Sequence, residues 1–271
     1  MPELPEVETT RAGIAPHLVG QRVVEVKVYQ RQLRQPVTPG LATALKGGVI
    51  NAVERRGKYL LLKSGQGCVI IHLGMSGSLR LVKRDQPLEK HDHVAFLLAS
   101  GKSLRFRDPR RFGLVLWTRK PPQQHPLITK LGVEPLEANF DGDYLYAAAQ
   151  KRTVAIKQLI MNGQVVVGVG NIYASEALFR AGVHPARAAK RISRVRYERL
   201  VVAIKSVLAE AIKQGGTTLR DFYNGAGEPG YFKQHLKVYG RSGLACVECG
   251  AAIRQIVLGQ RSTWYCGRCQ R

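Results

Sequence analysis

Long hydrophobic runs are missing from this sequence of 271 residues. A helix that crosses a bilayer needs about 18 or more consecutive apolar residues, and no such run occurs. Residues 1–14 carry Glu3, Glu6 and Glu8 and lack the basic stretch followed by an apolar one that is typical of a secretory signal. We therefore expect a cytoplasmic protein without a membrane-spanning segment.

Cysteine is also scarce. The chain has five cysteines, too few for the disulfide framework of a secreted domain, and no export signal accompanies them. We therefore expect a reducing compartment and no disulfide bonds. One cysteine, Cys68, stands apart from the others in an apolar run and is interpreted as a small buried strand residue.

Acidic residues are the third shortage. The 19 Asp and Glu residues face 42 Lys and Arg residues, which leaves a formal charge of +23 and an isoelectric point near 10.3. Such an imbalance favours a polyanionic partner, namely DNA, RNA or, less often, an anionic membrane. A basic solvated surface without such a partner is the alternative. Apolar residues make up 45% of the chain, which is enough for a hydrophobic core.

One helix and several short strands are predicted for residues 1–118. Pro5 suits the first position of the helix, because its missing N–H would have no partner there. The apolar residues expected along one face of this helix are Val7, Ile14 and Leu18. Alternating or apolar runs predict strands at residues 24–28, 59–62, 68–73, 78–82, 94–98, 103–106 and 114–117. Many short strands with regular turns indicate a β-sandwich.

The pattern changes after residue 118. Residues 119–142 are rich in proline and are interpreted as a linker, and residues 143–230 have helical periodicity. One helix is expected at residues 171–181, and a second before Gly215 and Gly216. The apolar stripe of this second helix is Leu200, Ile204, Val207, Leu208 and Ala211. A flexible loop is expected at residues 224–230, and residues 237–271 form a further domain. The prediction is an α+β multidomain protein.

The remaining four cysteines form two pairs of the type Cys-x-x-Cys. The pairs are Cys246 with Cys249 and Cys266 with Cys269, and 16 residues separate them. This spacing is typical of a structural zinc site with four thiolate ligands, in which each pair belongs to one tight turn. The segment between the pairs can form a hairpin. Because no ligand position stays open, we expect one structural zinc ion per chain and no metal catalysis.

The N-terminus has a residue with nucleophilic potential. A small residue follows Met1, so removal of Met1 would expose Pro2 as a secondary amine. An α-amino group has a pKa of about 7.7–8.0, and the positive end of the following helix would lower that pKa, so a neutral fraction exists at pH 7. A neutral amine can form a Schiff base with a sugar carbon, and Glu3 could handle protons. Proline after Met1 is common, so this pattern alone is a weak signal.

Several motifs are spread over the whole chain. They are Met-Pro-Glu-Leu-Pro-Glu-Val-Glu-Thr at the start, Gly-Lys-Tyr-Leu at 57–60, His-Leu-Gly-Met-Ser-Gly at 72–77, Lys-His-Asp-His at 90–93, Asp-Pro-Arg-Arg-Phe-Gly at 108–113 and Gly-Val-Gly-Asn-Ile-Tyr-Ala-Ser-Glu at 168–176. Together with the zinc ribbon, they resemble the formamidopyrimidine-DNA glycosylases, also called MutM. The resemblance implies an N-terminal β-sandwich, a helix–two-turn–helix domain and a C-terminal zinc ribbon. It also implies a DNA-repair enzyme that removes oxidised purines from double-stranded DNA and cleaves the strand by β,δ-elimination.

The resemblance assigns catalytic roles to four residues. It implies that Pro2 attacks C1′ of the damaged nucleotide and that Glu3 donates a proton. It implies that Lys58 donates the proton for β-elimination, and a lysine near the amine would also keep that amine neutral by like-charge repulsion. Without the resemblance, Lys58 is an ordinary lysine at a strand end that faces phosphate. Arg261 matches the ribbon arginine that contacts phosphate and assists δ-elimination.

Three further residues match the family's intercalating set, which fills the space left when the damaged base leaves the stack. They are Met75, Arg110 and Phe112. An apolar wedge combined with a cation can unstack and kink a duplex. The alternative for Met75 and Phe112 is core packing, although Phe112 lies in a polar, turn-like stretch where a core phenylalanine is less expected.

Three other positions match the family's DNA contacts. Asn171 follows two glycines at the start of a predicted helix, where backbone N–H groups can approach a phosphate. His91 and Arg152 match further contacts. His91 and His93 could instead suggest a second metal, but without a third ligand such histidines more often bind phosphate or solvent.

Two other classes of protein stay open. An endonuclease VIII-like glycosylase uses the same N-terminal chemistry on oxidised pyrimidines, and residues 220–230, which resemble the lesion-covering segment, carry Arg220 where some relatives have lysine. A non-catalytic DNA-binding zinc-ribbon protein would explain the charge and the cysteines but not the N-terminus. A monomer that is associated with the nucleoid through DNA is the expected state.

Overall fold

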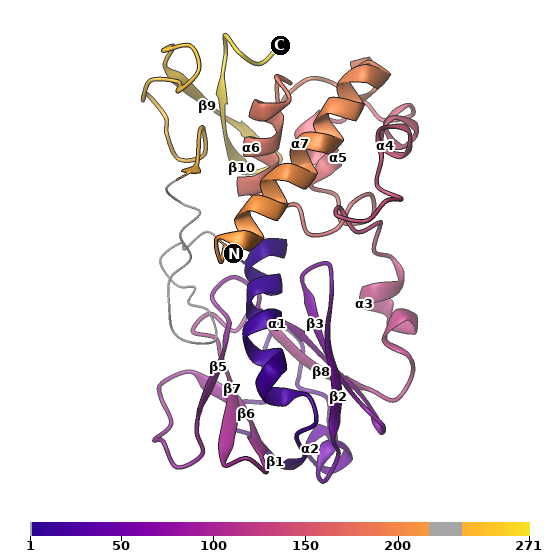
Figure 1. Cartoon of the computed structure of the whole chain (residues 1–271), viewed down its shortest axis with the longest axis vertical. Helices are drawn as coiled ribbons and strands as arrows, with labels where there is room; N and C mark the ends of the chain where they lie inside the picture. Colours follow the sequence, from indigo (N-terminus) through magenta and orange to yellow (C-terminus); the bar gives the residue numbers. More distant parts are fainter. Residues whose placement is uncertain (1, 217–234) are drawn as a thin grey trace. The chain divides into compact units, whose positions relative to one another are not determined.

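The computed structural model describes residues 2–216 and 235–271. The loop predicted at residues 224–230 and the longer lesion-covering segment at 220–230 lie outside these residues. Figure 1 shows the order of the described elements, with strands in the indigo to magenta part of the chain and mainly helices after it. Within this part, no helix is both long and apolar enough to cross a bilayer.

The chain divides into two compact units. The first unit contains residues 1–130 and 214–233, and the second contains residues 131–213 and 234–271. The predicted linker at residues 119–142 is not structureless, since it contains η1 (Pro122–Gln124) and α3 (Pro126–Thr129).

Eight strands of the first unit form two antiparallel sheets of four strands each. One sheet has the order β1 (Val23–Val28), β6 (Asp92–Leu98), β7 (Lys102–Arg107) and β5 (Ser78–Lys83). The other has the order β2 (Ile50–Arg56), β3 (Tyr59–Ser64), β4 (Gly67–His72) and β8 (Leu114–Thr118). The short helix α2 (Leu41–Leu45) lies between β1 and β2 in the sequence.

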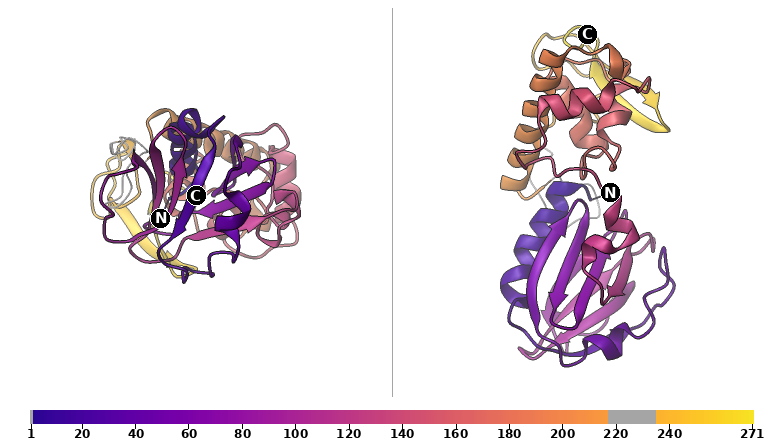
Figure 2. Two further views of the ribbon diagram at one scale, coloured as in Figure 1. Left: turned by 90° about the horizontal axis from the view of Figure 1, so that it is seen from below. Right: turned by 90° about the vertical axis from the view of Figure 1, so that its right-hand side faces the viewer.

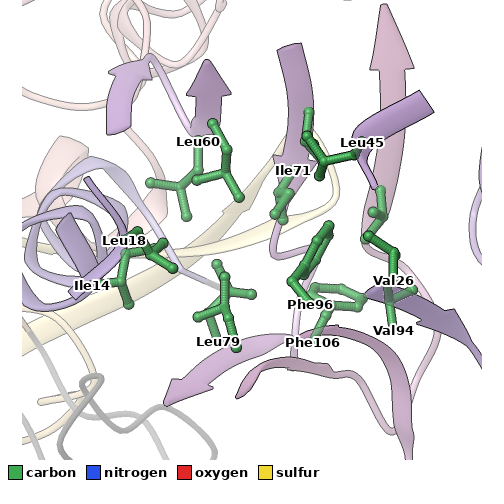
Figure 3. Packing of buried hydrophobic residues seen from close by; sticks show 14 of the residues in the cluster. Ile14, Leu18, Val26, Leu45, Leu60, Ile71, Leu79, Val94, Phe96 and Phe106 are labelled. Atoms are coloured by element: carbon green, nitrogen blue, oxygen red, sulfur yellow. The ribbon is translucent and has the colours of Figure 1, made fainter. Parts of the chain in front are cut away.

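The main hydrophobic core contains side chains from both sheets. Leu60 and Ile71 come from one sheet, Phe96 and Phe106 from the other, and all four are at most 1% exposed (Figure 3). The second face of β3, β4 and β8 is covered too, in a smaller cluster to which Leu127 of α3 belongs. Because these strands are buried on both faces, their sequences are continuous apolar runs and not alternating ones. The predicted β-sandwich is confirmed.

The first two strands depart from a simple alternating pattern. In β1 the residues buried in the core are Val23 and Val26, three positions apart, because the register shifts between Val23 and Glu25. The sequence did not predict β2, whose register shifts between Ile50 and Ala52. Such irregularities insert an extra residue into one strand and so break the period of two.

Helix α1 (Leu4–Leu18) packs along β2 and β3 of the first unit (Figure 2, right view). It begins one residue before Pro5, the predicted first position, so that Pro5 lies inside the first turn, where its missing N–H still needs no partner. The three residues predicted for its buried face are confirmed as at most 1% exposed: Val7, Ile14 and Leu18.

The second unit is mainly helical. Its elements are α4 (Gly142–Ala149), α5 (Ile156–Ile160), α6 (Asn171–Arg180), η2 (Ala189–Arg191), α7 (Arg194–Lys213), β9 (Ile253–Leu258) and β10 (Arg261–Cys266). The predicted apolar stripe of α7 is buried along its length, and α6 begins at the predicted residue. The short helices α4 and α5 were not predicted.

The C-terminal hairpin β9–β10 packs against α6 through β10. Phe179 of α6 shares an apolar cluster with Val238, Ile253 and two of the cysteines. Glu176 of the same helix is 1% exposed, and its carboxylate accepts hydrogen bonds from the backbone N–H groups of Lys237, Val238 and Tyr239 at 2.9, 3.0 and 2.8 Å. A carboxylate with several N–H donors anchors the segment that leads into the ribbon.

Candidate functional site

Pro2 and Glu3 lie directly before the first turn of α1. Both side chains are buried, and Glu3 is 3% exposed. Glu3 is the N-cap residue, and its backbone N–H donates to Oε2 of Glu6 at 2.7 Å within a capping box. The backbone that carries Pro2 and Glu3 is therefore held at the positive end of a helix.

Lys58 follows Gly57 in the tight turn between β2 and β3, where Gly57 has a φ of 56°. A chain of hydrogen bonds connects this turn to α1. Oε2 of Glu8 accepts from Nε of Arg55 at 2.9 Å, and Nη1 of Arg55 donates to the carbonyl oxygen of Gly57 at 3.0 Å. The turn that carries Lys58 is thus held against the helix that follows Pro2. The sequence did not reveal the contribution of Glu8 and Arg55, since these residues are 47 positions apart.

His72 at the end of β4 responds to the positive charge in this region. Burial, and after it the charges of Lys58 and Arg34, lower the pKa of His72 from 6.5 to about 4. The neutral ring accepts a hydrogen bond at Nδ1 from the backbone N–H of Gly74, at 2.9 Å. His72 therefore helps to position the segment that contains Met75.

Met75 and Phe112 are exposed by 41% and 44%, so the core-packing alternative for these two residues is wrong. The guanidinium carbon of Arg110 lies 4.8 Å from the centre of the Phe112 ring, a cation–π arrangement. The two segments approach closely at Gly74, where an added Cβ would lie 2.5 Å from the carbonyl carbon of Phe112. The structure therefore brings the three predicted intercalating residues to one surface.

The two histidines of the Lys-His-Asp-His motif have different surroundings. His91 is partly exposed and has a φ of 76°, in the left-handed region. His93 is 7% exposed, and its Nε2 lies 2.8 Å from the carbonyl oxygen of Asp108. The expectation that both rings bind phosphate or solvent is wrong for His93. Among the described residues, no group that could hold a metal includes either ring.

In the second unit, Asn171 is connected to the hairpin that carries Arg261. Nδ2 of Asn171 donates to the carbonyl oxygen of Ser262 at 3.0 Å. The buried Lys157 donates from Nζ to Oγ1 of Thr263 at 2.8 Å. Arg261 is exposed at the start of β10. These contacts hold the backbone next to Arg261 from α5 and α6, and Lys157 is a contributor that the sequence did not reveal.

Arg152 lies in the turn between α4 and α5. Its backbone N–H donates to the carbonyl oxygen of Ala149 at 2.9 Å, and its own carbonyl oxygen accepts from Lys190 at 3.2 Å. The side chain is partly exposed.

The four predicted cysteines converge. Their Sγ atoms lie within 4.8 Å of one another, with 3.9 Å between Cys246 and Cys269 and 3.5 Å between Cys249 and Cys266. A tetrahedral zinc ion with Zn–S bonds of about 2.3 Å separates its sulfur ligands by about 3.8 Å. The donor set and its spacing therefore fit one structural zinc ion. Cys68, in β4, is 2% exposed, as predicted.

Comparison with known proteins gives matches along the chain. Residues 1–115 match the formamidopyrimidine-DNA glycosylase N-terminal domain, residues 131–223 match the H2TH domain of these glycosylases, and residues 243–271 match a zinc finger found in FPG and IleRS. The formamidopyrimidine-DNA glycosylases of Thioalkalivibrio sulfidiphilus and Methylococcus capsulatus are 59% and 57% identical, with complete coverage of both chains.

Solved structures are similar over the same length. A Lactococcus lactis FPG mutant in complex with DNA that contains Fapy-dG has a TM-score of 0.92 at 35% identity, with complete coverage of both chains. The MutM (FPG) protein of Thermus thermophilus has a TM-score of 0.87 at 36% identity, covering 99% of this chain and 98% of that one.

The fold and the cysteine site define a DNA-repair glycosylase with a zinc finger. More specifically, the chain belongs to the formamidopyrimidine-DNA glycosylase family. It is an enzyme of base-excision repair that acts on oxidised purines, its partner is DNA, and its four clustered cysteines bind one structural zinc ion. This membership decides against the endonuclease VIII-like class and the non-catalytic class.

Replacement of Cys249 by Ala is expected to abolish stoichiometric zinc binding, because a three-thiolate site loses one bond and its closed geometry. The ring of Trp264 lies 4.4 Å from that of Tyr239 beside the cysteines, so its fluorescence reports on the ribbon in a Trp117→Phe background. Elemental analysis and this fluorescence should both change. Cys68→Ala is the matched control and should keep one zinc ion per chain. One zinc ion per chain in Cys249→Ala would contradict the assignment.

Acidification should destabilise the first unit partly through His72. The folded-state pKa lies near 4 and the usual value is 6.5, so between these values the unfolded chain takes up a proton that the folded chain does not. Stability therefore falls as the pH falls through this window. In His72→Asn, whose amide oxygen can replace Nδ1 as acceptor, urea unfolding followed by Trp117 in a Trp264→Phe background should depend less on pH. Equal slopes for the wild type and His72→Asn would contradict the prediction.

Proposed function

We propose that this chain removes 8-oxoguanine and formamidopyrimidines from double-stranded DNA with Pro2 as the nucleophile, and then cleaves the strand by β,δ-elimination. The position of Pro2 carries the proposal, because it is buried directly before α1 and beside the buried Glu3. Removal of Met1 gives Pro2 its secondary amine. Structures of the L. lactis protein with DNA that contains Fapy-dG or an abasic site support this type of substrate and product.

In the proposed reaction, Pro2 N attacks C1′ while the bond between C1′ and the base breaks, and the base leaves with the bonding electrons and takes up the proton that Pro2 N loses. Glu3 donates a proton to the ring oxygen O4′, the bond between C1′ and O4′ breaks, and a cationic iminium forms between Pro2 N and C1′. The iminium withdraws electrons, so that C2′ loses a proton and the 3′ phosphate leaves in β-elimination. A second elimination expels the 5′ phosphate, and water then hydrolyses the iminium to release Pro2.

Lys58 and Arg261 act in the elimination steps of this scheme. The hydrogen bonds from Glu8 through Arg55 to Gly57 support a fixed position for Lys58, which is the proton donor of β-elimination. Its positive charge, which lowers the pKa of His72, also disfavours the protonated form of a nearby amine. Arg261 contacts the phosphate and assists δ-elimination, and its exposed position at the start of β10 supports this role.

Six residues contact DNA in this proposal, and three of them fill the gap that the flipped nucleotide leaves. These three, which together form the wedge, are Met75, Arg110 and Phe112. The exposure of Met75 and Phe112 and the contact between Arg110 and Phe112 support this role. The other contacts are His91, Arg152 and Asn171. For Asn171, its position as the first residue of α6 supports a phosphate contact, because the N-terminal end of a helix attracts anions.

The proposed domains follow one another along the sequence. Residues 1–118 form the catalytic sandwich, residues 119–142 connect it to the DNA-binding domain at 143–230, and residues 237–271 form the zinc ribbon. We propose a cytoplasmic monomer that is associated with the nucleoid through its DNA affinity. The formal charge of +23 supports strong attraction to DNA, which should weaken with added salt because bound counterions are released.

Borohydride trapping tests the nucleophile. Incubation with a duplex that contains 8-oxoguanine opposite cytosine should give a covalent adduct, because borohydride reduces the iminium to a stable amine. Mass spectrometry should locate the link at Pro2, in a protein that lacks Met1. A chain extended at its N-terminus is the matched control, since Pro2 N then lies in a peptide bond and should give no adduct.

Other outcomes of the trapping experiment contradict parts of the proposal. An adduct at a lysine would contradict the role of Pro2 and leave the reaction class intact. An adduct with an oxidised pyrimidine but not with 8-oxoguanine would contradict the substrate. Tight DNA binding without an adduct on either lesion would indicate a DNA-binding protein that does not catalyse the reaction.

Arg261→Ala is expected to slow strand cleavage and weaken DNA binding by roughly 10- to 100-fold, as for loss of a charged hydrogen bond of about 1.5–3 kcal/mol. The salt dependence of log K should fall by about one unit for one lost phosphate contact. Arg254→Ala in β9 of the same hairpin is the matched control, because this side chain lies over Gly267 beside the cysteines. Equal behaviour of the two variants would rule out a specific role for Arg261.

A further inference from the structure

We propose that Asp108 is a positioning residue that holds the wedge and the His91 segment as one preformed surface. The inference rests on the proposed wedge function and adds to it the group that keeps the wedge exposed. Asp108 is 0% exposed and touches none of the reacting atoms in the scheme above. Its hydrogen bonds nevertheless reach three separate segments of the first unit.

The carboxylate of Asp108 connects two segments of the wedge. Oδ1 accepts from Oγ of Ser76 at 2.7 Å, and Ser76 directly follows Met75. Oδ1 also accepts from the backbone N–H of Arg110 at 3.3 Å, and Oδ2 accepts from that of Gly113 at 2.8 Å. The carboxylate therefore holds both ends of the turn that presents Arg110 and Phe112, and it joins this turn to the Met75 segment.

The backbone of Asp108 reaches the third segment. Its N–H donates to the carbonyl oxygen of His91 at 3.1 Å, and its carbonyl oxygen lies 2.8 Å from Nε2 of the buried His93. The same carbonyl accepts from Arg111, which has a φ of 56° in the left-handed region. Asp108 thus bonds to Ser76, 32 positions before it in the sequence, and to His91, 17 positions before it.

The chemistry of the wedge explains why such a residue is required. Exposed Met75 and Phe112 side chains would gain free energy by turning towards the core, so a loose loop would bury them. Hydrogen bonds to a carboxylate are stronger than those to a neutral acceptor. While Asp108 is present, an inward turn of the loop would break these hydrogen bonds and leave a buried carboxylate without donors, so the inward arrangement is costly.

Asp108→Asn tests the inference, because the amide keeps the size and one acceptor but turns one acceptor into a donor that faces the Gly113 N–H. The duplex carries 8-oxoguanine with 2-aminopurine beside it, whose fluorescence rises when its neighbours unstack. We expect a reduced fluorescence rise and about 10- to 100-fold slower single-turnover base excision, as for misplacement by about 1 Å. Cleavage of a single-stranded abasic oligonucleotide, which needs no wedge, should stay within twofold of the wild type.

Ser76→Ala is the second variant, in case Asp108→Asn does not fold. It removes one hydrogen bond to Oδ1 and should lower the fluorescence rise and the excision rate in the same direction by a smaller factor. Ser103→Ala in β7 is its matched control, because Ser103 is also a buried serine of the first unit, at 2% exposure, and should leave both readouts unchanged. Thermal melting establishes that each variant is folded.

Phe112→Ala separates failure of this inference from failure of the wedge assignment. If Phe112→Ala loses the fluorescence rise while folded Asp108→Asn and Ser76→Ala keep it, the wedge stands and the positioning role is wrong. If Phe112→Ala and Met75→Ala keep the full rise, the wedge assignment is wrong and the inference falls with it. If Asp108→Asn slows duplex excision and single-stranded cleavage equally, Asp108 has a general structural role and the inference is overturned.

Discussion

Buried carboxylates that accept hydrogen bonds from backbone N–H groups fix the functional segments of this protein. Glu6 accepts from Glu3 at the N-terminus, Asp108 from Arg110 and Gly113 at the wedge, and Glu176 from the three residues that lead into the ribbon. In the wedge turn, Arg111 has a φ of 56°, in the left-handed region that residues with a side chain rarely adopt. A buried acid with several N–H donors supplies the required direction, and it is costly to leave unsatisfied, so alternative arrangements of the segment are destabilised.

Burial of these carboxylates also makes the surface charge of the protein more positive, which favours contact with DNA. Among the acidic residues that the structure describes, the buried ones are Glu3, Glu6, Asp92, Asp108 and Glu176. Hydrogen bonds and neighbouring groups compensate these buried carboxylates, while most of the described Lys and Arg residues are exposed. The surface is therefore relatively poor in carboxylates that would repel phosphate. Positioning of the functional segments and attraction of a polyanion follow from the same distribution of residues.

Local patterns were predictable, and long-range contacts were not. The cysteine site follows from spacing over short turns, and the stripe of α7 follows from a helical period that no irregularity interrupts. Strand β2 was missed because a register shift between Ile50 and Ala52 breaks its alternation. The exposure of Met75 and Phe112 could not be deduced from their apolar side chains, because it depends on Asp108, which lies 32 positions from its partner Ser76.

The zinc site and the contacts from α5 and α6 fix different parts of the C-terminal hairpin. The cysteines close the two turns of the ribbon, but the hairpin residues next to Arg261 are held from elsewhere, by Asn171 on Ser262 and by Lys157 on Thr263. Lys157 is 1% exposed, so the hydrogen bond from its Nζ to Thr263 offsets part of the cost of burying a polar group. The metal therefore fixes the shape of the hairpin, whereas α5 and α6 fix the place at which Arg261 is presented. A loss of either contribution should displace Arg261, because an exposed side chain is positioned only as well as the backbone that carries it.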